Sequence, residues 1–255
     1  MLAQQLPAAR GVFWLRAGFA LDRRSPPLLT LLTMGYLLVV LGFGLIPLFG
    51  PFLLPLMLPA LTALVANGCR FLDLADGSRL PLSRALTSGL VEQKGALLRL
   101  GVLHLTGTLA VLGIDTLIEG SGWAGLGLGE SNEAVGLAHM LRLMLIASPL
   151  LLAFWFAPLL TAWDGVPAAK SLFFSFIAAW RNWRAFLAYA LAAMLLGVFL
   201  PGLLLIVASL ISKTLGDVIS MALRLLLVLI FAPVLMASVY LSYRDVFHSP
   251  PAANA

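Results

Sequence analysis

The chain has 255 residues, of which 61% are hydrophobic and only 11% charged, and its mean hydropathy is +1.02. No water-soluble domain of this length keeps a polar surface with so few charged side chains, so the composition excludes a soluble globular protein and indicates a polytopic membrane protein. The net charge of +5 is spread over separate connections, which disfavours nucleic-acid binding. The single cysteine, Cys69, excludes an internal disulfide.

A short stretch with basic residues precedes the first apolar run. Leu15 and Phe19 are four positions apart, which places both on one face of a helix, and Arg23 follows one turn later. This pattern predicts an amphipathic helix that lies along the membrane surface. The Ser-Pro-Pro sequence at 25–27 then favours the start of a new helix, because proline in a first turn loses no internal hydrogen bond.

Six apolar runs follow one another, and each is close to the roughly 20 residues that a helix needs to cross a hydrocarbon core of about 30 Å. Their continuous Leu, Ala and Val content favours helices over the alternating strands of a barrel. The sequence therefore predicts an all-α polytopic membrane protein with six transmembrane helices. The runs cover residues 28–48, 51–69, 96–118, 138–162, 185–210 and 218–241.

Only the short apolar turn Ile-Pro-Leu-Phe-Gly-Pro, at 46–51, separates the first two runs. Such a turn suits either a hairpin that crosses the membrane or one that dips into it, and we favour crossing. The first run is longer than the apolar region of a signal peptide and lacks a small-residue cleavage site. We therefore expect it to remain as a transmembrane span.

The later connections on the same side repeat the pattern of the first. Aligning one small residue of each connection brings their apolar pairs into register, and in the third connection the stripe extends to two tryptophans. We expect three interfacial helices, which either bind a lipid or partner or simply connect the spans. The aligned small residues are Gly18, Gly89 and Ser175, and the interfacial positions are Leu15, Phe19, Leu86, Leu90, Leu172, Phe176, Trp180 and Trp183.

A proline-centred phrase recurs late in every second apolar run: P-A-L-T-A from Pro59, P-L-L-T-A from Pro158 and P-V-L-M-A from Pro233. Its recurrence predicts three copies of one helical hairpin, each preceded by its interfacial helix. Each proline removes a backbone donor, so we expect three helix kinks around a pseudo-threefold axis. The expected copies are about 8–75, 80–165 and 167–245 of a single membrane domain covering 1–255, with 246–255 a disordered cytoplasmic tail.

Basic residues gather in alternate connections, whereas the connection at 119–137 carries Glu119, Glu130 and Glu133. By the positive-inside rule both termini are cytoplasmic and 119–137 lies outside. The outer connection contains a Gly-Leu-Gly sequence at 127–129. Its acidic neighbours, and the lack of a following Lys-Ser/Thr, argue against a phosphate-binding loop.

Four ionisable side chains lie within the runs or near their ends: His104, Asp115, Arg142 and Arg224. Ionisable groups are costly in a membrane, so together they form a possible intramembrane polar site. We expect Asp115 to pair with Arg142 or Arg224 near the outer surface, the alternative being that the arginines extend to the interface. His104 is either a proton relay or haem ligand, or a histidine hydrogen-bonded within the helix bundle.

The residue sets of known catalytic and metal sites are missing from the sequence. It contains no HExxH, no CxxC, no Ser/His/Asp set and no pair of inward carboxylates. We therefore expect no enzyme activity, no metal and no cofactor.

Four segments together resemble an uncharacterised bacterial family of six-helix inner-membrane proteins. They are R-G-V-F-W-L-R-A-G-F from Arg10, Ser-Pro at 25–26, the turn at 46–51 and the A-P-L phrase from Ala157. More distantly, the pattern is similar to the membrane domain attached to some glycerophosphodiester phosphodiesterases. The resemblance implies a multi-pass protein of the bacterial inner membrane and carries over no catalytic residue.

The favoured function is a non-enzymatic integral inner-membrane module that binds a protein or lipid partner through its cytoplasmic interfacial helices. The alternative is a lipid or small-molecule translocator, which the internal repeats and kinked helices favour and the scarcity of polar residues disfavours. The expected partners are membrane lipids, together with a protein partner or a second copy of the chain.

Overall fold

The computed structural model describes residues 3–74, 81–119 and 133–248, and these residues form helices joined by short turns. Two π-helical segments, Leu195–Phe199 and Leu227–Phe231, interrupt the last long helices. In chain order the α-helices are α1 (Ala9–Asp22), α2 (Pro26–Gly44), α3 (Gly50–Asp73), α4 (Leu82–Thr87), α5 (Lys94–Glu119), α6 (Glu133–Asp164), α7 (Ala168–Arg181), α8 (Trp183–Met194), α9 (Leu200–Ile211), α10 (Lys213–Leu226) and α11 (Ala232–Phe247). The Gly-rich connection and the expected tail lie mostly outside the described residues.

Six helical stretches among the described residues are long and apolar enough to cross a membrane, which confirms the predicted number. α2 has 19 residues and is therefore about 28 Å long, close to the thickness of the hydrocarbon core. The last two stretches, Trp183–Ile211 with 29 residues and Lys213–Phe247 with 35, are longer than the sequence predicted. They extend beyond the predicted runs at both ends, where the helix continues through polar and charged residues such as Asp217 and Arg244. Within these stretches, a π-helical segment lies just before Pro201 and another just before Pro233.

The prolines of the recurring phrase occupy two different settings. Pro59 lies inside α3 and Pro158 inside α6. Pro233, in contrast, lies in the first turn of α11, directly after Leu227–Phe231. The turn before Pro233 is thus a widened π turn, which leaves room for a residue without a backbone donor, and a kink at Pro233 stays a prediction.

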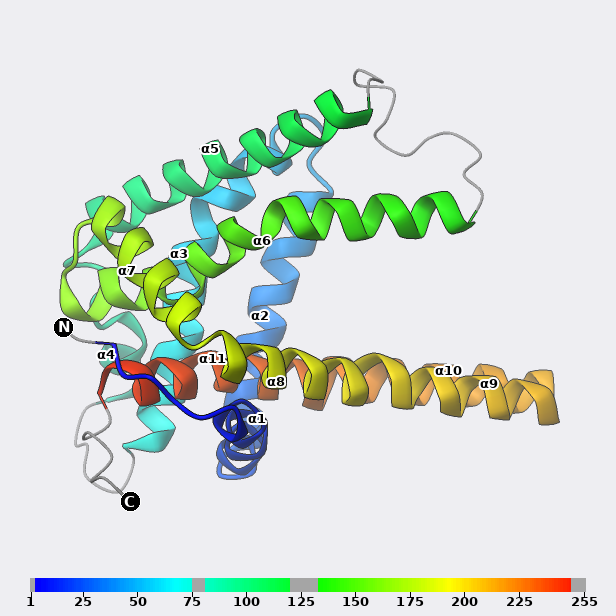
Figure 1. The fold of residues 1–255 in the computed structure, drawn as a ribbon. Coiled ribbons are helices and arrows are strands. Elements are labelled where there is room, and N and C mark those ends of the chain that lie inside the picture. Colours follow the sequence, from blue (N-terminus) through cyan, green and yellow to red (C-terminus); the bar gives the residue numbers. More distant parts are fainter. Residues whose placement is uncertain (1–2, 75–80, 120–132, 249–255) are drawn as a thin grey trace.

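The helices pair as antiparallel neighbours, α2 with α3, α5 with α6, and α8–α9 with α10–α11. The second and third pairs leave the body in a similar direction and diverge from each other toward their tips (Figure 1). Close approach between α3 and α5 depends on Gly101, where an added methyl group would collide with the carbonyl oxygen of Leu56. The fold is therefore a set of splayed helical hairpins joined at one end.

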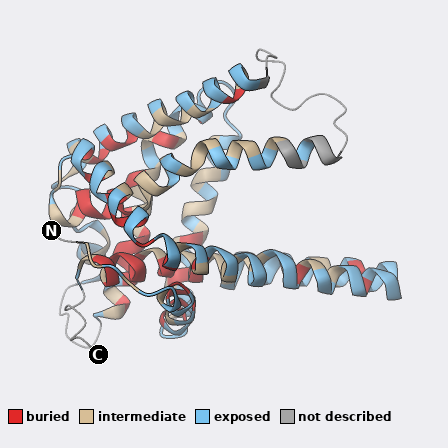
Figure 2. Ribbon diagram, viewed as in Figure 1, coloured by how far each residue is buried: buried red, intermediate tan, exposed pale blue. Residues whose placement is uncertain are grey.

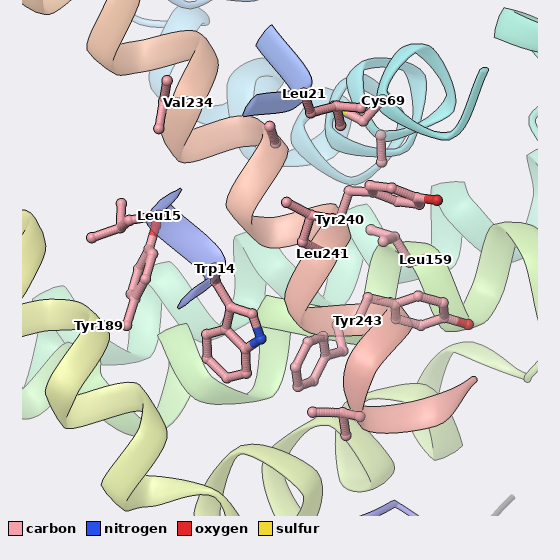
Figure 3. Packing of buried hydrophobic residues seen from close by; sticks show 14 of the residues in the cluster. Trp14, Leu15, Leu21, Cys69, Leu159, Tyr189, Val234, Tyr240, Leu241 and Tyr243 are labelled. Carbon is pink, nitrogen blue, oxygen red and sulfur yellow. The ribbon is translucent and has the colours of Figure 1, made fainter. Parts of the chain in front are cut away.

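Buried residues concentrate at that joined end, whereas the far halves of the hairpins are mostly exposed (Figure 2). We call this end the base; it consists of α1, α4, α7, the start of α8 and the ends of α3, α6 and α11. Its core contains Trp14, Phe156 and Tyr243, all fully or almost fully buried, and Cys69 lies in the same cluster (Figure 3). A backbone hydrogen bond of 2.9 Å from Gln4 to Val246 ties the two described ends of the chain together.

Candidate functional site at the base and between the hairpins

The outer face of α7 carries large apolar side chains. Phe173 and Trp180 are 62% and 63% exposed, and Phe174 is also exposed. Lys170 and Arg181 lie exposed at the two ends of the same helix. Aromatic rings beside cations on an exposed helix are typical of a surface at the level of lipid headgroups.

The opposite face of α7 is made of small residues that pack against α6. Ser171, Ser175, Ala178 and Ala179 are buried. The Ser175 hydroxyl donates to the carbonyl of Leu152 and accepts from the backbone N–H of Phe156, each at 2.9 Å, so it inserts into the hydrogen-bond ladder of α6. α7 therefore turns its small side chains inward and its large ones outward, an arrangement suited to a helix next to lipid.

Trp183 does not share a helix with Trp180, contrary to the single stripe expected from sequence. α7 ends at Arg181 and α8 begins at Trp183. Asn182 between them is buried, and its side chain holds the N-terminal segment by accepting from the Leu6 N–H at 2.8 Å and donating to the Gln4 carbonyl at 2.9 Å. Trp183 is nevertheless 54% exposed, so both tryptophans remain on the surface of the base.

α1 differs from the surface helix that its sequence predicted. Leu15 is buried in the base, because α1 packs between α8 and α11 and uses Gly11 and Gly18 for close contact. Phe19 is exposed, and the guanidinium of Arg23 lies 4.4 Å from the centre of its ring. Of the expected apolar pair on α1, only Phe19 therefore faces outward.

The connection after α3 does not form one continuous amphipathic helix. α4 ends at Thr87, and Gly89 has a φ of +74°, a conformation that disfavours residues with a Cβ. Leu86 is therefore on α4 whereas Leu90 lies beyond its end, and both are half-buried. The side-chain amide of Asn67 holds this connection by donating to two of its carbonyl oxygens at 2.8 and 2.9 Å.

The aligned residues Gly18, Gly89 and Ser175 each lie close to helix backbone, as Gly11 and Gly101 also do. A Cβ added at Gly18 would meet the Val234 carbonyl of α11, and one at Gly89 would meet the Ala162 carbonyl of α6. Ser175 contacts the backbone of α6 through its hydroxyl. Each aligned small residue thus lies where its connection touches the backbone of a transmembrane helix.

Sequence reasoning missed the polar network inside the base. Asp245, 2% exposed, accepts hydrogen bonds from Trp14 Nε1 at 2.9 Å and from Arg10 Nε at 3.0 Å. The Asp73 carboxylate accepts from Tyr240 at 2.7 Å and from Arg244 at 2.6 Å. These partners are far apart in sequence, so their spacing carries no signal.

Asp22 stands apart from this network. Its side chain is 6% exposed, and its Oδ1 has no hydrogen-bond partner among the described residues. Burial raises the pKa of the Asp22 carboxyl above its usual range.

The structure pairs Asp115 with Arg142 rather than with Arg224. Arg142 Nε donates to Asp115 Oδ1 at 2.8 Å, and a terminal guanidinium nitrogen of Arg142 lies 2.7 Å from His139 Nδ1. Asp115 itself is 6% exposed. Arg224 lies on α10 with an exposed side chain. Arg142 therefore neutralises the buried carboxylate of Asp115 near the far ends of α5 and α6.

A cavity of about 260 Å³ lies where the three hairpins meet, lined by residues of α2, α3, α5, α6 and α11. His104 lines it and stacks on Phe154 with ring centroids 4.4 Å apart. The Nδ1 of His104 is buried and has no hydrogen-bond partner in the described part of the chain.

Metal ligands do not gather anywhere in the described residues. No group of three or more His, Cys, Asp or Glu side chains there is arranged to hold an ion. His139 and Asp115 approach each other at 3.9 Å, but Arg142 lies between them as the stronger partner of the carboxylate.

Comparison with known proteins places the chain among membrane proteins. It is 35% identical over 212 residues to a protein of Burkholderia thailandensis described as a probable inner membrane protein, and the match covers 76% of each chain. The chain belongs to the family of this inner membrane protein. No family model and no solved structure matches it. Together with six apolar helices, this relationship supports a transmembrane helix bundle in the inner membrane.

Proposed function

We propose that this family member is a non-enzymatic inner-membrane module that binds membrane lipid at its base, with the base on the cytoplasmic side. The observation that carries the proposal is the outward aromatic face of α7 beside exposed cations. The guanidinium carbon of Arg184 lies 5.5 Å from the centre of the Trp183 ring, and that of Arg23 lies 4.4 Å from the centre of the Phe19 ring. Such pairs keep an apolar ring in the interface and a cation at headgroup phosphates.

The cytoplasmic orientation rests on charge. Cations of the chain concentrate on the helices and turns of the base, and the positive-inside rule places that end in the cytoplasm. A base at the anionic leaflet surface gains about 1 kcal/mol per nearby cation, which favours lipid binding there.

We also propose that the three hairpins are structural repeats. α1 packs on α11, α4 on α3 and α7 on α6, so each connecting helix contacts the returning helix of the preceding hairpin in cyclic order. This cyclic order is what a pseudo-threefold arrangement of the three sequence copies requires.

The experiment uses the full chain in nanodiscs that contain phosphatidylethanolamine and phosphatidylglycerol, with bound lipid counted by native mass spectrometry. Replacing Trp180 and Trp183 by Glu should lower phosphatidylglycerol retention several-fold, because a carboxylate repels the anionic headgroup and is unfavourable in the interface. The matched control, with Tyr at both positions, keeps an interfacial aromatic and should retain lipid.

Two other outcomes decide against the lipid proposal. Unchanged lipid retention, with loss of a protein that co-purifies with the wild type, would assign the surface to a protein partner. If neither lipid nor protein recovery changes in the folded Glu variant, the aromatic face has no binding role.

Lipid translocation is the second candidate function. The cavity between the hairpins and the two prolines that line it, Pro59 and Pro158, favour it. Its test is the transfer of a fluorescent phospholipid between leaflets of reconstituted vesicles, and rates equal to those of protein-free vesicles would exclude it.

A further inference from the structure

A second cavity, of about 190 Å³, lies at the base where α1, α3 and α11 come together. Four small or apolar side chains and three charged ones line it: Ala17, Ala20, Leu21, Arg24, Asp73, Leu241 and Arg244. Leu21 and Leu241 belong to the buried core (Figure 3), whereas Ala20 and Arg24 are exposed. The cavity therefore has a buried apolar floor and opens to the surface beside Arg24.

The charged groups of this cavity do not balance one another. The Asp73 carboxylate accepts hydrogen bonds from Arg244 Nη1 at 2.6 Å and from the Tyr240 hydroxyl at 2.7 Å, so the charge of Arg244 neutralises it. Arg24 has no carboxylate partner among the described residues, and its side chain donates only to the Leu72 carbonyl, at 3.4 Å. Two guanidinium groups and one carboxylate thus leave the lining with one excess positive charge, that of Arg24.

The three charged residues lie at the ends of membrane-spanning helices. Arg24 comes just before α2, Asp73 is the last residue of α3, and Arg244 lies in the last turn of α11. These helix ends place the cavity at the boundary of the hydrocarbon core, which is the level of the lipid phosphates.

We propose that this cavity binds the phosphodiester group of one anionic glycerophospholipid of the phosphatidylglycerol type. Arg24 donates to the phosphate oxygens through its planar fork of N–H groups, which matches phosphate geometry. Arg244, held in place by Asp73, has five N–H donors and supplies a further one. The glycerol backbone packs against Leu241, and the acyl chains pass Ala20 at the mouth and continue into the bilayer.

Charge and lining select this class of ligand. One excess positive charge balances the single negative charge of a phosphodiester, whereas a phosphomonoester carries further negative charge. An added ammonium group, as in phosphatidylethanolamine, would restore the excess positive charge. The apolar part of the lining suits the glycerol and first acyl carbons of a lipid and gives nothing to a free, hydrated phosphate ion.

The test uses the full chain in phosphatidylcholine nanodiscs that contain a phosphatidylglycerol probe, with a photoactivatable diazirine near the glycerol end of one acyl chain. Labelled peptides are identified by mass spectrometry, so labels on α1 and α11 are read separately from labels on α7. The probe should label α1 and α11 around Leu21 and Leu241. A diacylglycerol probe with the same acyl chains should label them at least about ten-fold less, the effect of losing a charge-assisted hydrogen bond.

Two variants at exposed positions separate this cavity from the general charge of the base. Arg24→Gln should reduce labelling of α1 and α11 at least about ten-fold. Arg23→Gln is the matched control, because the neighbouring exposed arginine lies over Phe19 and does not line the cavity. Ala20→Trp keeps every charge but fills the mouth, so it should reduce labelling to a similar extent. Protection of buried Cys69 from a thiol reagent shows that each variant is folded.

Four results would overturn the inference. They are equal labelling by the diacylglycerol probe, equal loss in the Arg23→Gln and Arg24→Gln variants, undiminished labelling in folded Ala20→Trp, and displacement of the probe by inorganic phosphate as effectively as by unlabelled phosphatidylglycerol. The last of these would assign the cavity to a free anion. The inference does not depend on the function proposed for α7, because Glu at positions 180 and 183 should change labelling of α7 and leave that of α1 and α11 unchanged.

Discussion

Replacing Asp245 by Ala tests whether the buried network holds the base together. The change leaves the indole N–H of Trp14, a fully buried residue, without its acceptor, at a cost of about 1–3 kcal/mol. Loss of the bonds from Arg10 adds about 1 kcal/mol, because that side chain is 34% exposed and partly screened. The expected loss of stability is therefore about 2–4 kcal/mol.

The single cysteine provides the assay. Cys69 is fully buried in the base, so a thiol-reactive fluorophore reports unfolding of the core during heating. For a chain of this size, 2–4 kcal/mol corresponds to a decrease in the labelling midpoint of between roughly 4 and 16 °C. Asp217→Ala, at an exposed position on α10, should leave the midpoint within experimental error.

A second substitution, at Trp14, distinguishes loss of this hydrogen-bond network from general destabilisation of the fold. Trp14→Phe removes the indole donor, so Asp245→Ala should cost less in that background than in the wild type. Equal midpoints for Asp245→Ala, Asp217→Ala and the wild type would refute the assigned role of Asp245. Strict additivity of the two network substitutions would refute the coupling.

Of three further predictions, two use the same labelling midpoint and the third uses the accessibility of introduced cysteines to a reagent. Gly101→Val should lower the midpoint by several degrees because its side chain collides with the backbone of α3, whereas Gly95→Val on the same helix meets open space and should change it little. Asp22→Asn should raise the midpoint at pH 7.5, because a carboxyl whose folded pKa is raised destabilises the fold increasingly as pH rises from its unfolded pKa to its folded pKa, and the gain should shrink toward pH 4. A cysteine at Ser121 should react with a membrane-impermeant reagent added from the periplasm and one at Ser83 should not; the reverse would invert the proposed orientation.

The number and class of the helices could be predicted from sequence because both follow from hydrophobic length. A run of about 20 apolar residues has a single stable arrangement in lipid, a helix that satisfies its own backbone. The lengths of the last two helices were underestimated, because an apolar run stops at its first polar or charged residues, such as Asp217 and Arg244, whereas the helix continues through them.

The candidate site could be predicted only in part. Asp115 and an arginine were expected to pair because an unpaired carboxylate is costly in a membrane, and the choice of Arg142 follows from α5 and α6 being neighbours. The prediction of which helix faces are exposed was less reliable. Leu15 and Phe19 fit one amphipathic stripe by spacing, yet the packing of α1 between two helices buries the first and exposes the second.

α7 shows why amphipathicity is ambiguous in a membrane protein. In water the large apolar face of a helix packs inward, because burial removes it from solvent. Next to lipid that preference vanishes, and the face with small side chains contacts the neighbouring helix because it lets the two backbones approach closely. Ser171 and Ser175 therefore face α6, while Phe173 and Trp180 face outward. The predicted stripe matches the outward face only in part, because Trp180 is exposed whereas Leu172 and Phe176 are half-buried.

The same principle explains two ways in which neighbouring hairpins pack. α3 and α5 approach closely because Gly101 removes side-chain volume between their backbones. Between α6 and α8, the rings of Trp155, Phe186 and Tyr189 make the contact instead. Lipid tails are as apolar as these side chains, so large rings gain little from lying between helices rather than facing lipid. Small residues therefore bring helix backbones together in this fold, whereas aromatic rings join hairpins through their side chains.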